Sequence, residues 1–322
     1  MTLSDTGLRT PARGRVALER RPSGGRRRNL LGSTSLVHPP GVGLALVLPA
    51  VLFVAVFVLA PLVFAIYISL TNWPLIGRYK FVGLDNYVSI AQDAVFWHAV
   101  LYTLTYTAIV TVPILVLGYL MAVVVRANRR GSTALRTIFF LPYVIGLSTL
   151  SFLLVLEAQP GSGAVNFVLK ALQLTDGTTA WLVNGALATG LICLLVIWAV
   201  SGLTMVLLIS GMQSIPRELY ESAEMDGAAW WSREFHITIP LLRRPIAMSL
   251  VLSVIGSFLA FSQFYILTQG GPGHATTPIV LYIYQRAFVQ LQVGAATAAS
   301  IVLVIVVALI SAGQLWFMRE RD

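Results

Sequence analysis

Long apolar runs alternate with short polar segments along most of this chain. Six of the runs contain no Asp, Glu, Lys or Arg. A helix rises about 1.5 Å per residue, so about 20 apolar residues cross a bilayer core of about 30 Å. We therefore predict an all-α polytopic membrane protein with about six transmembrane helices. The predicted spans lie near residues 44–70, 99–125, 137–156, 186–209, 246–268 and 295–317.

The composition agrees with a membrane protein. Hydrophobic residues make up 57% of the 322 residues, charged residues make up 11%, and the mean hydropathy is +0.81. A soluble domain carries about 25% charged residues. All of the charge lies outside the predicted spans, and its distribution indicates the orientation of the protein.

The basic residues predict which loops face the cytoplasm. The N-terminal tail, residues 126–136, residues 210–245 and the C-terminus hold 18 of the 22 Lys and Arg residues. These segments alternate with loops that hold few basic residues, and cytoplasmic loops are the ones enriched in Lys and Arg. We expect a multi-pass protein of the cytoplasmic (inner) cell membrane with both termini in the cytoplasm.

Residues 1–40 form a separate basic segment. They contain eight arginines against Asp5 and Glu19 and are rich in Gly, Pro and Ser, so they are predicted to be a disordered cytoplasmic tail. No aromatic residues lie between the arginines, so nucleic acid is not an expected partner. The transmembrane domain is predicted to cover residues 41–322.

The most charge-dense segment of the apolar part of the chain is the 215–245 loop, which holds five of the 13 acidic residues. Pro216 suits the first turn of a helix, with Ser214 as its N-cap. Gly227 suits the left-handed position that ends a helix. A second helix is expected over residues 228–239.

The second helix has a regular apolar spacing. Trp231, Phe235 and Ile239 lie four residues apart and are therefore predicted to share one face. The loop is thus predicted to form a helix, a glycine break and a second helix just outside the membrane. This shape is suited to binding another protein.

The spacing within the loop resembles a known family motif. Glu221-Ser222-Ala223 is followed after three residues by Gly227, and after nine more by Ile237-Thr238-Ile239-Pro240. The pattern is similar to the EAA loop of permease subunits of binding-protein-dependent ABC importers. Ser222 stands where the family usually has Ala, and Ile239 where it usually has Leu. The residues that the resemblance assigns to ATPase coupling are Glu221, Ser222, Ala223, Asp226, Gly227, Phe235, Ile237 and Pro240.

The resemblance implies a fold of the type I ABC importer kind, with the loop seated as a coupling helix in a cleft of an ATPase subunit. Besides the lipid bilayer, it implies a second homologous permease subunit, two ATPase subunits and an extracytoplasmic substrate-binding protein. Residues 81–87 and 267–272 resemble segments of carbohydrate-uptake permeases, so the expected substrate is a sugar or related polyol. The alternatives are a glycerophosphate importer of the same plan and an ion-coupled secondary transporter.

The chain itself is not expected to be an enzyme. A Walker A loop needs Gly-Lys followed by Ser or Thr, whereas the two lysines, Lys80 and Lys170, are followed by Phe81 and Ala171. ATP and Mg²⁺ are therefore expected on the partner ATPase, with no cofactor bound by this chain. A single cysteine and four widely separated histidines predict no metal site.

Neutral polar and aromatic residues in two spans are candidates for the substrate path. They are Gln263, Phe261 and Tyr265 in the fifth span, and Tyr143 and Ser148 in the third. Hydroxyl and amide groups beside aromatic rings suit an uncharged sugar, although they also hydrogen-bond between packed membrane helices. Ion-coupled carriers keep ionisable residues in mid-membrane, and these spans contain no Asp, Glu, Lys or Arg. The driving force is therefore expected to enter from outside the bilayer.

Overall fold

The computed structural model describes residues 40–74, 77–126 and 131–318, and the regular structure in these ranges is helical. The predicted tail of residues 1–40 lies outside them apart from its last residue, so it stays a prediction. The chain divides into two compact units, residues 1–54 and 55–322. The first contributes the helix α1 (Pro40–Val54), and the second holds the remaining helices.

Five helices in the described part of the chain have the length and composition to cross a membrane. They are Leu46–Ser69, Ala94–Arg126, Gly185–Gln213, Arg243–Leu267 and Val293–Trp316. Each coincides with a predicted span, so these five predictions are confirmed. The third predicted span, residues 137–156, differs.

That span is two helices with a sharp bend between them. α5 (Ser132–Ile145) and α6 (Leu147–Glu157) meet at an angle of 89° on either side of Gly146. Gly146 has φ 87° and ψ 145°, a conformation that residues with a Cβ rarely adopt. The prediction of one continuous helix over residues 137–156 is therefore wrong, although the two halves together are apolar and long enough for a span. The bent pair makes a sixth span only if its two halves are counted together.

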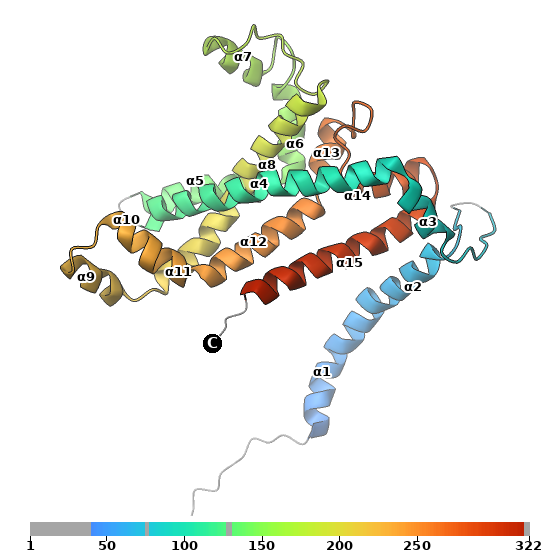
Figure 1. Ribbon diagram of the computed structural model, residues 1–322, viewed down its shortest axis with the longest axis horizontal. Helices are drawn as coiled ribbons and strands as arrows, with labels where there is room; N and C mark the ends of the chain where they lie inside the picture. The colour runs from blue at the N-terminus through green and yellow to red at the C-terminus, as the bar shows by residue number, and fades with distance from the viewer. Residues whose placement is uncertain (1–39, 75–76, 127–130, 319–322) are drawn as a thin grey trace, which may run out of the picture. The chain divides into compact units, whose positions relative to one another are not determined.

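The longest helices of the second unit are α4 (Ala94–Arg126), α8 (Gly185–Gln213), α12 (Arg243–Phe258) and α15 (Val293–Met318). The shorter elements between them are η1 (Ala55–Leu59), α2 (Ala60–Ser69), α3 (Asp85–Gln92), α7 (Ala164–Ala171), α9 (Arg217–Met225), α10 (Trp230–Arg233), η2 (Glu234–Thr238), α11 (Ile239–Leu241), α13 (Ser262–Leu267), α14 (Ile279–Tyr284) and η3 (Gln285–Val289). Figure 1 shows α9, α10 and α11 at the end of the bundle where α4 ends, and α3 and α14 at the opposite end.

The start of α4 is fixed by an acidic side chain. Asp93 Oδ1 accepts a hydrogen bond from the Val95 N–H at 2.8 Å, so the helix begins at Ala94, earlier than the predicted residue 99. Asp93 Oδ2 also accepts from the Tyr282 hydroxyl at 2.8 Å and pairs with Arg286 at 3.1 Å. Burial, followed by the hydrogen bond to Asp93, raises the pKa of Tyr282 to about 12. The hydroxyl therefore remains a donor at neutral pH.

Small residues let α8 approach its neighbours closely. A Cβ at Gly118 of α4 would lie 2.5 Å from Thr204 Cγ2 of α8. A Cβ at Gly202 of α8 would lie 2.2 Å from the carbonyl oxygen of Phe139 in α5. Such contacts suit membrane helices, whose association depends on close packing because lipid tails are as apolar as the side chains. Buried side chains of α4 and α8 complete this core: Tyr106, Val110, Ile114, Ile192, Val196 and Ala199.

The contact at Gly202 predicts the effect of a single added methyl group. Gly202→Ala forces α8 away from the Phe139 backbone, and such overpacking costs about 1–3 kcal/mol. We expect the melting temperature of the detergent-solubilised protein to fall by roughly 5 °C. Gly190→Ala, on the same helix with open space around its Cβ, is the matched control and is expected to leave the melting temperature unchanged. Equal melting temperatures for the two variants would contradict the close packing of α8 on α5.

Candidate functional site

The 215–245 loop folds as two short arms joined at a glycine. The first arm is α9, and the second (residues 230–241) is formed by α10, η2 and α11 in succession. Gly227 has φ 75°, and the turn is closed by hydrogen bonds from Ala228 N–H to Ala223 O at 2.9 Å and from Gly227 N–H to Glu224 O at 3.0 Å. This bonding pattern is the Schellman motif, which favours glycine at its left-handed position. The predicted helix–Gly–helix geometry is confirmed.

The boundary of the first arm differs from the prediction. Ser214 is not the N-cap of α9. The Ser214 hydroxyl donates instead to the Gly211 carbonyl in the last turn of α8, at 2.7 Å. Pro216 precedes the helix, with φ −59° and ψ 135°, and Arg217 is the first helical residue. α8 extends to Gln213, which leaves Ser214 too close to α8 to cap the next helix.

The second arm differs in its start and in its faces. It begins at Trp230, and the turn over Glu234–Thr238 is a wide π-helical turn, which inserts an extra residue. Trp231 and Phe235 stack with ring centroids 6.2 Å apart and are 65% and 58% exposed. Ile239 is half-buried, so the predicted face of three residues is reduced to two.

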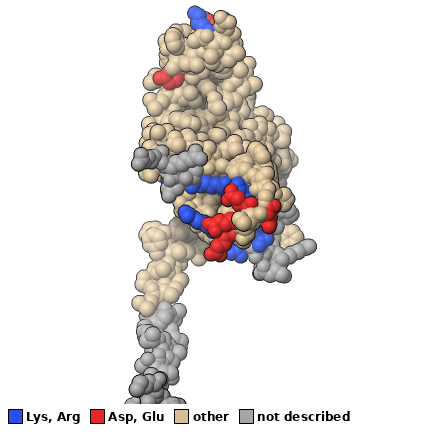
Figure 2. All heavy atoms as spheres, turned by 90° about the vertical axis from the view of Figure 1, so that its left-hand side faces the viewer, with Lys and Arg blue, Asp and Glu red and all other residues tan. Residues whose placement is uncertain are grey.

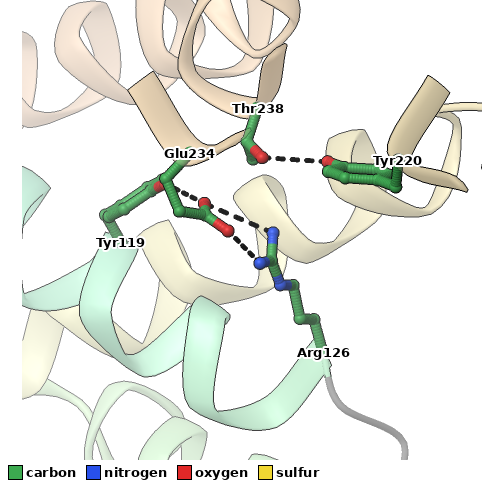
Figure 3. Close-up of polar contacts among 5 residues, drawn as sticks. All are labelled: Tyr119, Arg126, Tyr220, Glu234 and Thr238. Carbon is green, nitrogen blue, oxygen red and sulfur yellow. Dashed lines mark hydrogen bonds and ion pairs between the residues drawn. The ribbon is translucent and has the colours of Figure 1, made fainter. Parts of the chain in front are cut away.

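A buried carboxylate anchors the second arm to the bundle (Figure 3). Glu234 is 2% exposed and accepts a hydrogen bond from the Tyr119 hydroxyl at 2.6 Å. Its other partner is the guanidinium of Arg126, with which it forms an ion pair. Tyr119 and Arg126 both belong to α4. These three residues are called the Glu234 anchor below.

The two arms are also tied to each other. The hydroxyls of Tyr220 in α9 and Thr238 in η2 lie 2.9 Å apart, and Thr238 is fully buried (Figure 3). An ion pair of 3.2 Å joins Arg233 to Glu224 across the glycine turn. Because Glu224 is exposed, this second pair is screened by water and contributes little. The angle between the arms thus depends mainly on Gly227 and on the buried hydroxyl pair.

The outward face of the loop combines apolar and acidic side chains. Met225 is 88% exposed, and Leu219, Trp230, Trp231 and Phe235 are also exposed. Figure 2 shows Asp and Glu gathered on this face beside Lys and Arg. The exposed acidic residues of the first arm and its turn are Glu218, Glu221, Glu224 and Asp226. An exposed apolar patch rimmed by charge is typical of a protein-binding surface.

The structure brings the predicted coupling residues together on this loop. Those with exposed side chains or backbone are Glu221, Ser222, Asp226, Gly227, Phe235 and Pro240. Ala223 and Ile237 are half-buried. Their role in coupling stays a prediction.

A cavity of about 230 Å³ lies between α4, α8, α12 and the junction of α5 with α6. Its described lining contains no Asp, Glu, Lys or Arg. Serines spaced four apart on α12 line it, namely Ser249, Ser253 and Ser257. The Ser249 hydroxyl is buried without a protein partner, whereas Ser253 donates to Thr111 and Ser257 to the Ser253 carbonyl. The cavity is thus apolar with a line of neutral hydroxyl groups.

Two of the five predicted path residues line this cavity. Gln263 is 2% exposed and donates from Nε2 to the Tyr106 hydroxyl at 3.3 Å, and Tyr143 lies on the α5 side. Phe261 and Tyr265 lie outside the lining, where they stack on each other at 5.3 Å and contact Tyr284. Ser148 is exposed on α6 and also lies outside the lining. The structure therefore does not bring these three residues to the cavity.

Residues 114–319 match the model of a protein family described as binding-protein-dependent transport system inner membrane component. The chain belongs to this family. The match covers the last turns of α4, all of α8 and the whole 215–245 loop. The part of the chain that matches the family therefore includes the loop and most of the cavity lining.

Several proteins are similar to this chain over most of their length. The probable ABC transporter permease protein YurN of Bacillus subtilis is 34% identical, over 84% of this chain and 94% of that protein. The multiple sugar-binding transport system permease protein MsmF of Streptococcus mutans is 32% identical, over 86% and 94%. A crystal structure of a bacterial alginate ABC transporter, in complex with alginate pentasaccharide-bound periplasmic protein, contains a chain with TM-score 0.77 and 24% identity. That match covers 87% of this chain and 94% of the other, and it shows the fold alone.

Two groups of site residues are not found by sequence reasoning. The Glu234 anchor joins Glu234 to residues 108 and 115 positions away, and nothing in the sequence pairs them. The three serines of α12 do carry a signal, because their spacing of four places them on one helix face. That signal distinguishes the cavity face from the lipid face only once the neighbouring helices are known.

Proposed function

We propose that this inner membrane component is a permease subunit of an ATP-driven ABC importer for a neutral sugar or related polyol. In this proposal it forms half of the translocation path, together with a second homologous permease subunit. Two ATPase subunits hold ATP and Mg²⁺ on the cytoplasmic side, and one of them docks on the 215–245 loop of this chain. A loaded substrate-binding protein docks at the opposite, extracytoplasmic end of the bundle.

The observation that carries the proposal is the outward face of the 215–245 loop. Its apolar side chains are exposed although the arms behind them are held by buried contacts, so the face is preformed for a partner. The central apolar residues suit burial in a cleft, and the acidic rim suits basic residues around it. Glu221, at the outer surface of the first arm, is the residue that we expect to pair with a basic side chain of the ATPase.

The chemistry of the cavity supports a neutral, hydroxyl-rich substrate. Ser249, Gln263 and Tyr143 supply hydroxyl and amide groups among apolar walls. The described lining has no basic residue to pair with a phosphate, which disfavours the glycerophosphate alternative. The name of one relative, a multiple sugar-binding transport system permease protein, supports a sugar as the substrate.

Ion-coupled secondary transport is disfavoured by two findings. Membership of the binding-protein-dependent family points to a transporter of several subunits. The described cavity lining also lacks the carboxylates that proton- or sodium-coupled carriers use. The energy for transport is therefore assigned to the ATPase subunits.

The connections of the loop indicate how that energy reaches the cavity. The loop joins the end of α8 to the start of α12, and both helices line the cavity. When the ATPase subunits close, the two arms move with them. Rigid-body displacement of the attached helices then opens the cavity to one side of the membrane and closes it to the other.

Substitutions at Gly227 test the role of the loop. Gly227→Pro fixes φ near −65°, whereas the turn requires φ 75°, so it breaks the angle between the arms. We expect loss of uptake of ¹⁴C-labelled neutral sugars by intact cells, with normal amounts of protein in the membrane. Gly227→Asn is the matched control, since Asn tolerates the left-handed region and the Cβ has open space there. Normal uptake by the Pro variant would contradict a coupling role.

Reversing a charge tests the same surface without changing the backbone. Glu221→Lys places a like charge against the basic partner residue that we propose. We expect uptake to be lost and the amount of ATPase that co-purifies with the membrane subunit to fall, while membrane insertion is unchanged. Unaltered co-purification would show that the ATPase does not contact this residue.

The cavity is tested by removing its amide. Gln263→Leu removes the polar group that meets the Tyr106 hydroxyl, a loss of about 1.4 kcal/mol for a substrate hydrogen bond. We expect the KM of transport for neutral sugars to rise by about tenfold. Ser300→Ala on α15, whose hydroxyl bonds within its own helix and lies outside the cavity lining, is expected to leave the KM unchanged. An unchanged KM in both variants would place the path elsewhere.

A further inference from the structure

The second arm of the 215–245 loop has a polar inner face and an apolar outer face. On the inner face, Glu234 and Thr238 are buried, and each is bonded to a side chain of another helix. On the outer face, Trp231 and Phe235 are exposed. The arm therefore has one face for a partner and another that is fixed to this chain.

The Glu234 anchor connects the second arm to α4, a helix that does not continue into the loop; Arg126 also lies over the Tyr220 ring of the first arm, 6.0 Å from its centroid. α8 and α12 continue into the loop through the backbone, but α4 ends at Arg126, far from the loop in sequence. α4 supplies Tyr106 and Ile114 to the cavity lining. Three helices of the cavity wall are thus attached to the loop, two by the backbone and α4 by the anchor.

The directional contacts of the Glu234 anchor specify where the second arm lies on α4. Hydrophobic burial is non-directional, so apolar contacts alone do not specify where the second arm lies along α4. Hydrogen bonds depend on direction and distance, so Tyr119 and Arg126 fix the carboxylate at two points of α4 that lie two turns apart. Stability alone does not account for this pair, because well-packed apolar residues often replace a buried ion pair without loss.

The surroundings of the anchor leave space for movement. A cleft of about 440 Å³ lies beside it, lined by Arg126, Glu234, Tyr220, Trp230 and Arg233, among others. The arm is therefore held at the ion pair but not packed on all sides. The anchor, rather than close packing on every side, therefore keeps this part of the arm in place on α4.

We propose that the Glu234 anchor transmits the displacement of the 215–245 loop to α4. Glu234 is then a positioning residue for transport. It acts on α4 through its bonds to Arg126 and Tyr119. The inference rests on the proposed function, since it requires an ATPase that moves the loop. It adds a third cavity helix to the two that the backbone moves.

The test uses the complete transporter, co-purified with its partner subunits and reconstituted in liposomes. The variants are Glu234→Gln, Arg126→Glu, Glu234→Arg and the double charge exchange R126E/E234R. Ser300→Ala, whose hydroxyl bonds only within α15 and lies away from the loop, is the control. Three quantities are measured: co-purification of the ATPase, ATP hydrolysis with and without the loaded binding protein, and a distance between spin labels.

The spin labels report the anchor itself. They are placed at exposed positions, Val124 at the end of α4 and Ser232 on the second arm, in a Cys193→Ala background. In the unsubstituted anchor we expect one narrow distance distribution that Mg-ATP and vanadate leave unchanged, because arm and helix move together. In Glu234→Gln we expect a broad distribution that shifts on addition of Mg-ATP and vanadate.

Measurements of ATP hydrolysis distinguish a loss of coupling between the loop and α4 from a loss of folded protein. In Glu234→Gln and in each single charge reversal we expect the ATPase to co-purify normally, while the stimulation of hydrolysis by the binding protein falls by about tenfold. The double charge exchange is expected to restore at least one third of the stimulation. This restoration keeps the test valid if a single reversal lowers the amount of folded protein.

Opposite results identify which proposal fails. Normal stimulation and a narrow label distance in Glu234→Gln would overturn the role of the anchor and leave the proposed function intact. Absence of rescue in R126E/E234R would also overturn it, since a directional ion pair then plays no part. Failure of the ATPase to co-purify with the unsubstituted chain would instead overturn the proposed function.

Discussion

Burial of the Glu234 carboxylate restricts where the 215–245 loop can lie. Removing an isolated carboxylate from water is costly, and one left without partners would not remain buried and charged. The loop is therefore stable in this position only where Arg126 and Tyr119 meet it. The same chemistry recurs at the other end of α4, where Asp93 accepts from the Tyr282 hydroxyl and pairs with Arg286. A carboxylate with one tyrosine and one arginine thus fixes each end of this helix.

Local and long-range contacts contribute differently to the loop. Gly227 and its two backbone hydrogen bonds define the turn between the arms, and they lie within a few residues of one another. The position of the arms on the bundle depends instead on α4, through contacts that span more than a hundred residues. This division explains why the outward face is exposed yet ordered. Its apolar residues are not needed to hold the arms in place, which leaves them free for a partner.

Features set by local sequence were predicted from it, and features set by distant contacts were not. Charge-free runs located five spans, and Gly227 located the turn, because hydropathy and the left-handed glycine each act over a short stretch. The bend at Gly146 was missed because its apolar flanks look the same in a straight helix and in a bent one. The inward rotation of Ile239 was missed because the π turn preceding it brings Glu234 and Thr238 to their partners. Phe261 and Tyr265 were assigned to the path by residue type, whereas the structure places their rings in an aromatic cluster with Tyr284.

Neutral and charged residues occupy different parts of the proposed permease and are suited to different roles. The described lining of the cavity has neutral hydroxyl, amide and apolar groups, so a neutral substrate meets no strong electrostatic well there. Weak, exchangeable hydrogen bonds permit release as readily as entry, which a path requires and a tight binding site does not. The strong, directional ion pairs lie at the ends of α4, where they join elements that must move as one body. A path of this kind is therefore opened by moving its walls, and the residues that govern the movement lie outside the cavity that it opens.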